Sequence, residues 1–184
     1  MVFTVLTLVL ALGVALATRG DLGRITEAGF RRVWLLGAGV LIQAGLEFVR
    51  VGAGEDAYVP AGILLVSYAC ILGFCASNLR ITGMGVILIG VALNASVIAL
   101  NLGMPYRAPA GREMPASVKH RPERPDDVLT IISDRIVLPP LRTSISFGDL
   151  IIAVGLIDLC YRSSRRPNGA GRQARSSAAS TLTS

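Results

Sequence analysis

The chain is poor in charged residues and in the side chains that build metal or disulfide centres. Only 16% of its 184 residues are charged, whereas an average soluble domain carries about 25%. Its one histidine, His120, has no second histidine or cysteine at a ligand spacing, so no metal centre is expected. Cys70 and Cys75 would lie on different faces of a helix, and Cys160 is far along the chain. The cysteines therefore predict no disulfide framework and are interpreted as small packing residues.

Five apolar blocks, each long enough to cross a membrane, account for much of the chain. At about 1.5 Å of rise per residue, each block forms a helix about 25 to 32 Å long, which matches a hydrocarbon core of about 30 Å. A helix is the default because backbone polar groups in lipid must be satisfied within their own segment. The predicted helices cover residues of about 2–18, 33–49, 57–77, 81–101 and 144–161.

These blocks predict an all-α integral membrane fold, a five-helix transmembrane bundle within residues 1–161. The fourth and fifth helices are joined by a long Pro-rich loop, residues 102–143, which is predicted to be extracytoplasmic. The tail, residues 162–184, is basic and rich in Gly, Ser and Ala, which predicts disorder. The first block has an alternative interpretation as a cleaved signal peptide, but no positive charge precedes it in "MVFT". We therefore expect the first helix to be retained.

The distribution of basic residues predicts the orientation of the bundle. Placing the 19–32 loop, the 78–80 turn and the tail in the cytoplasm puts ten Lys and Arg residues inside and eight outside. Short loops count most in this rule, and seven of the eight outside residues belong to the long loop. We expect the N-terminus outside and the C-terminus inside. The arginines of the tail are expected to bind anionic lipid headgroups, and no nucleic-acid partner is expected.

Small residues recur on one face of two blocks, which favours close helix packing. The third block has Gly62, Ala69, Gly73 and Ala76, and the fourth has Gly83, Gly90, Asn94, Val97 and Asn101. Asn94 and Asn101 are predicted to face protein, because an amide that faced lipid would lack partners. Two interpretations stay open for them. They either join helices by hydrogen bonds or line a polar path in a small transporter or binding protein.

The last block begins with "SFGD", which allows two interpretations. In the first, Ser146 caps the helix and Asp149, three residues on, completes a capping box. In the second, Asp149 is paired with Asp134, which the apolar second half of the loop would bring back to the membrane surface. One carboxyl group would be protonated and the other would activate water, as in an outer-face membrane hydrolase. Asp158, nine residues beyond Asp149, is expected to pair with Arg162.

Four features together resemble an uncharacterised family of small bacterial multi-pass membrane proteins, catalogued as domain of unknown function 5317. They are "LNASVIALNLGMPY", the lone His120 in the following loop, "SDRIVLP" and "SFGDLIIAVG". The resemblance covers residues from 1 to about 161. It implies a multi-pass fold in the bacterial cell membrane, and it implies no activity. Of these residues, Asn94, Asn101, Ser146 and His120 are grouped as a candidate polar cluster.

A second and looser resemblance is to the lipoprotein signal peptidases, which cleave within membranes using two aspartates. It places Asn101, Gly103, Asp134, Arg135 and Asp149 in corresponding roles. The order of motifs differs, because the asparagine motif stands just before the Asp-Arg pair instead of early in the chain. Only fifteen residues separate the two aspartates. This resemblance implies the hydrolase alternative and nothing more.

The functional prediction is a multi-pass membrane protein that serves as a structural or accessory component of a membrane assembly. The stripes of small residues favour this function, as does the lack of a nucleotide loop, metal cluster or nucleophile triad. No cofactor is expected, and the protein is more readily interpreted as a non-enzyme. The expected partners are the lipid bilayer and either another membrane protein or a second copy of this chain.

Overall fold

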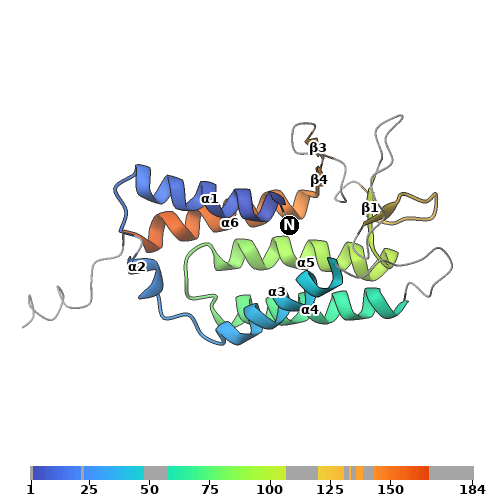
Figure 1. The fold of residues 1–184 in the computed structure, drawn as a ribbon, viewed down its shortest axis with the longest axis horizontal. Helices are drawn as coiled ribbons and strands as arrows, with labels where there is room; N and C mark the ends of the chain where they lie inside the picture. Colours follow the sequence, from blue (N-terminus) through green and yellow to red (C-terminus); the bar gives the residue numbers. More distant parts are fainter. Residues whose placement is uncertain are drawn as a thin grey trace, which may run out of the picture.

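A computed structural model of the chain contains a layer of long helices with short strands at one end (Figure 1). It describes residues 2–21, 23–47, 58–106, 120–130, 133, 136–138 and 143–165. The helices are α1 (Val2–Ala17), α2 (Gly23–Thr26), α3 (Val33–Glu47), α4 (Tyr58–Ser77), α5 (Met84–Asn101) and α6 (Phe147–Ser163). The strands are β1 (Met104–Tyr106), β2 (His120–Pro122), β3 (Ile136–Leu138) and β4 (Thr143–Ile145).

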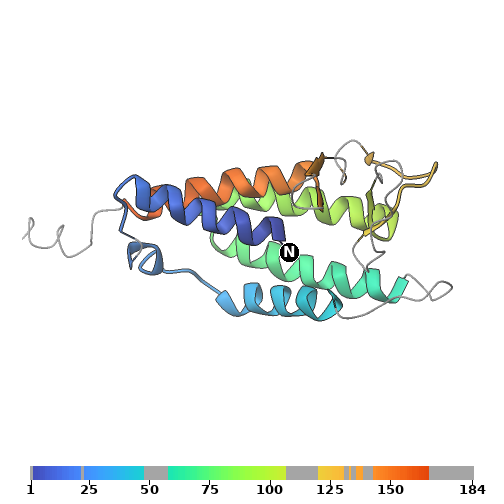
Figure 2. The same cartoon turned by 45° about the horizontal axis from the view of Figure 1, so that its top comes forward.

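The long helices pack in an order that differs from their order in the sequence. α1 packs on α6, α6 on α5, α5 on α4, and α4 on α3. The last helix of the chain therefore lies between the first helix and α5, as Figures 1 and 2 show. Neighbouring helices run in opposite directions along most of this row. The bundle has two ends, and each end carries its own short elements. We call them the α2 end and the strand end, after the short elements that each carries.

The mostly helical prediction is confirmed, with corrections. α4 and α5 are long and apolar enough to cross a membrane, whereas the apolar parts of α1 (Leu6–Ala17) and α3 (Val33–Leu46) are shorter. α5 begins at Met84 instead of residue 81, because Gly83 adopts a φ of 87° that an L side chain rarely allows and ends a tight turn. The all-α prediction holds in the coarser form of a mostly helical chain, because four short strands are also present. The short helix α2 is a further element that no apolar block predicted.

The strands form two small sheets at the strand end. β1 and β2 are parallel, with Met104 opposite His120, and β3 and β4 are antiparallel, with Ile136 opposite Ile145. α5 ends at Asn101 and is capped by Leu102, whose φ is 53° and whose N–H donates to the carbonyl of Ile98. The chain then enters β1, in which all three residues are buried. The first strand of the long loop is thus part of the packed structure.

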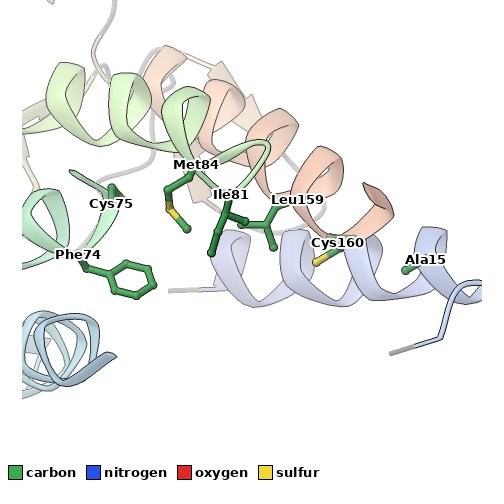
Figure 3. Packing of buried hydrophobic residues seen from close by; sticks show 8 residues of the cluster. Ala15, Phe74, Cys75, Ile81, Met84, Leu159 and Cys160 are labelled. Atoms are coloured by element: carbon green, nitrogen blue, oxygen red, sulfur yellow. The ribbon is translucent and has the colours of Figure 1, made fainter. Parts of the chain in front are cut away.

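Two groups of buried apolar residues hold the helices together. The first lies toward the α2 end and joins α1, α4, α5 and α6 (Figure 3). It contains Ala11, Ala15, Phe74, Cys75, Ile81, Met84, Leu159 and Cys160. The second contains Leu46, Leu64, Tyr68, Val91, Val97, Ile98 and Met104. Cys75 and Cys160 are free thiols within the first group, as their interpretation as packing residues predicts.

Candidate functional site

Glycines bring α5 and α6 into close contact. Gly83, the N-cap of α5, and Gly90 within α5 are seven residues apart, and so are Gly148 and Gly155 on α6. A Cβ atom added to Gly90 would lie 2.7 Å from the carbonyl oxygen of Gly148, and one added to Gly155 would lie 2.8 Å from the amide nitrogen of Ile87. Only glycine leaves room for this approach. The spacing of these glycines therefore sets where the polar residues of both helices meet.

Asn94, Ser146 and Asp149 meet where α6 begins against α5, and we call them the polar junction. Asn94 Nδ2 donates to Asp149 Oδ1 at 2.9 Å, and the Ser146 hydroxyl donates to Asn94 Oδ1 at 2.9 Å. Asn94 and Ser146 are buried, whereas Asp149 is half-buried. Gly148 makes room for the amide, because an added Cβ would clash with Asn94 Oδ1. The two ends of one amide thus link the two helices.

Ser146 and Asp149 also form the capping box that "SFGD" predicts. The Asp149 N–H donates to Ser146 Oγ at 3.0 Å, and the Ser146 N–H donates to Asp149 Oδ2 at 3.1 Å. A carboxylate in the first turn also suits the positive end of the helix dipole. Both carboxylate oxygens of Asp149 therefore accept hydrogen bonds from within the protein. The arrangement positions a helix end and holds its side chains in place.

Asn101, two turns beyond Asn94 on α5, binds the long loop instead of another helix. Its Oδ1 accepts from the N–H of Val128 at 2.9 Å, and its Nδ2 donates to the carbonyl of Val128 at 2.9 Å. Nδ2 also donates to the carbonyl of Val97, within α5. The side chain thus pairs with the loop backbone as a strand would. Asn101 is outside the polar junction, although it shares one face of α5 with Asn94.

Asn78 also pairs with the backbone of a distant segment, at the α2 end, and the sequence analysis did not predict this role. It is fully buried, and its Oδ1 accepts from the N–H of Arg31 at 2.7 Å while its Nδ2 donates to the Arg31 carbonyl at 2.8 Å. Phe30 stacks on Phe74 beside it, with ring centroids 6.1 Å apart. An asparagine just after the apolar block "ILGFCAS" was the available signal. Its partner is 47 residues away, which no local pattern reveals.

The remaining candidate residues have separate outcomes. Asp134 and Arg135 lie outside the described residues, so the pairing of Asp134 with Asp149 stays a prediction. The backbone of His120 pairs with Met104 in the parallel sheet, and its side chain lies outside what is described. Asp158 Oδ1 accepts from Arg162 Nε at 2.7 Å, so this ion pair is confirmed.

The buried side-chain polar atoms of the described residues are almost all hydrogen-bonded. The exceptions among them are Arg24 Nε, which lies 3.4 Å from Asp21 Oδ2 in an ion pair, and Ser163 Oγ. No group of three or more His, Cys, Asp or Glu side chains in the described ranges is arranged to hold a metal ion. The polar junction is therefore a satisfied network, of the kind that specifies how helices pack.

Comparison with known proteins identifies the family. The model of a family of unknown function, DUF5317, matches residues 27–161, which include α3, α4, α5, all but the last two residues of α6, and the whole polar junction. No curated protein and no solved structure matches the chain. Because the match extends over well more than half of the sequence, the chain belongs to the DUF5317 family.

Proposed function

We propose that this protein is a multi-pass integral membrane protein, crossing the bilayer with α1, α3, α4, α5 and α6, and that it serves as a structural or accessory component of a membrane assembly. α4 and α5, with 20 and 18 residues, are long enough to cross on their own. α3 has 15 residues and is about 23 Å long, so its crossing requires local thinning of the bilayer or flanking residues that reach the interface.

The surface of the helices carries this proposal. Large apolar side chains are exposed along every long helix, while several buried side chains are polar. Soluble proteins bury most large apolar side chains and rarely expose large contiguous apolar patches, whereas lipid tails favour an apolar protein surface. The exposed residues include Leu8, Val9, Leu10, Val40, Leu41, Ile63, Val66, Val86, Ile89, Leu150 and Val154. The buried polar residues include Ser67, Asn78, Asn94, Asn101 and Ser146.

Exposed aromatic residues at the helix ends support the same proposal. Trp34, at the start of α3, is 69% exposed, and Tyr58, at the start of α4, is also 69% exposed. Because α3 and α4 run in opposite directions, these two residues are at opposite ends of the bundle. Trp and Tyr are enriched at the two surfaces of a membrane, where an amphipathic ring has contact with both lipid and water.

The α2 end suits the cytoplasmic side. Its described basic residues come from the turns, from α2 and from the end of α6, and they outnumber the acidic ones. They are Arg19, Arg24, Arg31, Arg32, Arg80, Arg162 and Arg165. The orientation proposed from these residues is N-terminus outside and C-terminus inside.

The use of the polar side chains favours a structural role over a polar path. Asn94 and Asn101 bond other parts of the protein, and Gln43 Nε2 donates to Ser67 Oγ at 3.2 Å, which joins α3 to α4. A substrate that moved along the face of α5 with Asn94 and Asn101 would have to displace the hydrogen bonds of these two side chains. Interhelical bonds of this kind contribute about 0.6 kcal/mol each in membrane proteins.

One face of α3 is open to contact with an assembly partner. α3 is at the edge of the row and packs mainly on α4. Trp34, Gly37, Leu41 and Gly45 share its outer side, and a Cβ atom added to either glycine would meet nothing within 4 Å. Small residues on an open face permit the backbone of another helix to approach. We take this face as the contact with another membrane protein or a second copy.

Extraction in mild detergent tests the proposal. The expected result is that the protein stays with the membrane after an alkaline wash and is then recovered in a particle larger than one chain. Gly37→Leu combined with Gly45→Leu should reduce that particle, whereas Val66→Phe on the exposed side of α4 should not. Recovery of the wild-type chain in the soluble fraction, or as a lone monomer, would contradict it.

A further inference from the structure

The segment before α3 is fastened to the turn between α4 and α5 by hydrogen bonds in both directions. Asn78 pairs with the backbone of Arg31, as described above. In return, Arg80 Nη2 donates to the carbonyl of Gly29 at 2.9 Å. Arg32 Nη1 adds a longer contact of 3.5 Å with the Ser77 hydroxyl. Two parts of the chain that are far apart in sequence therefore hold each other at the α2 end.

This fastening gathers Arg31, Arg32 and Arg80 at one corner of the bundle, and we call them the arginine corner. All three residues are exposed. In the described ranges at this end, the ion pairs join Arg24 to Asp21 and Arg162 to Asp158, and neither involves the corner. A guanidinium has five N–H donors, so the two contacts above leave most donors of the corner available. The corner thus carries three positive charges on two segments that these hydrogen bonds hold side by side.

The arginine corner borders an exposed apolar surface. Val33 and Trp34 follow it directly in α3 and are 53% and 69% exposed, and Leu79 beside Arg80 is 54% exposed. A phospholipid has the matching pattern, with a charged phosphate next to its acyl chains. One guanidinium group can donate two parallel hydrogen bonds to a phosphate, a geometry that an ammonium group does not offer. A free phosphate would use the charges but would leave the apolar border without a role.

We propose that Arg31, Arg32 and Arg80 bind the phosphate of an anionic phospholipid headgroup in the inner leaflet, with its acyl chains against Val33, Trp34 and Leu79. The proposal rests on the proposed membrane location of the protein. It is distinct from binding by the C-terminal tail, because the corner is built from residues of the packed bundle. Removing one arginine is expected to lower the preference for anionic lipid by up to about fivefold, the factor for one cationic side chain at an anionic surface.

The only tryptophan of the chain provides the measurement, because Trp34 adjoins the corner. The full-length protein is reconstituted in bilayers that mix phosphatidylglycerol with phosphatidylcholine, and bromine atoms on the acyl chains of one lipid quench tryptophan fluorescence. Brominated phosphatidylglycerol is expected to quench Trp34 more than an equal fraction of brominated phosphatidylcholine. In the variant Arg31→Gln, Arg32→Gln, Arg80→Gln, the two lipids should quench equally.

Three controls make the result decisive. Arg124→Gln, an exposed arginine at the strand end, should keep the preference, and so should a chain that ends at residue 165. Soluble glycerol phosphate should not compete. The proposal is overturned if the wild type shows no preference, if the triple variant keeps it, if loss of the tail abolishes it, or if glycerol phosphate removes it. Flotation with the vesicles separates the two hypotheses, since a chain that fails to float contradicts the membrane location itself.

Discussion

Asn94 on α5 donates a hydrogen bond of 2.9 Å to Asp149, the residue that completes the N-terminal capping box of α6. The same amide accepts the hydroxyl proton of Ser146, the N-cap. The start of one helix is therefore bound through its own cap to the middle of another. This junction fixes the axial position of α6 between α1 and α5, and a change in any of its three members should loosen both helices.

Asn94→Ala is expected to lower the free energy of unfolding by about 1 to 2 kcal/mol, because Asp149 and Ser146 each lose a partner. Thermal unfolding in detergent, or titration with a denaturing detergent, measures the change. Ser96→Ala is the matched control, since Ser96 is exposed on the same helix and its hydroxyl donates to the carbonyl of Ala92 within that helix. Equal losses in the two variants would contradict a special role for the junction.

Gly148→Ala is expected to destabilise the protein through overpacking, by about 1 to 3 kcal/mol. The new Cβ would clash with Asn94 Oδ1 and would lie 2.7 Å from the carbonyl oxygen of Gly90, so α5 and α6 must separate. Gly13→Ala in α1 serves as the comparison, because nothing lies within 4 Å of its added Cβ. Differential scanning calorimetry of the two variants should show a Tm below that of the wild type for Gly148→Ala alone.

The two asparagines that bind distant backbone should act independently, each at its own end. Asn101→Ala is expected to speed hydrogen exchange of the Val128 amide while leaving the Arg31 amide protected. Asn78→Ala should have the reverse effect, because Asn78 accepts from Arg31. Exchange measured by mass spectrometry on peptides from both regions tests each variant against the other. Uniform loss of protection in either variant would mean global unfolding and would refute local fastening.

The Asp158–Arg162 ion pair is expected to contribute little stability despite its short distance of 2.7 Å. The Arg162 side chain is 62% exposed, and exposed pairs of this kind contribute about 0.2 to 1 kcal/mol. A double-mutant cycle with Asp158→Asn and Arg162→Gln measures the coupling. A coupling energy well above about 1 kcal/mol would show that the pair is screened from water, contrary to its exposure in this structure.

The helices and the cap were predictable from the sequence because both depend on local patterns. Apolar blocks of membrane length locate α4 and α5 closely, and the spacing of Ser146 and Asp149 is enough to predict the capping box. The ion pair of Asp158 follows from the four-residue repeat of a helix in the same way. In each of these cases the interacting groups are on one segment.

Features that depend on tertiary contacts were not predictable. The start of α5 is set by the left-handed backbone of Gly83, which packs against Gly155, 72 positions away in the sequence. The role of Asn78 depends on a backbone 47 residues distant. β1 forms because a parallel partner from the later loop lies beside it. Composition also gave no reason to expect that α6 would lie between α1 and α5.

In the proposed topology the chain crosses the membrane several times, with its α2 end in the cytoplasm. Paired reporters measure this most directly: green fluorescent protein, which fluoresces when it folds in the cytoplasm, and alkaline phosphatase, which is active only outside it. A fusion after Ser184 should fluoresce and lack phosphatase activity, and an insertion within residues 107–119 should give the opposite result. Both sites on one side of the membrane, or the reverse pattern, would contradict the proposed topology.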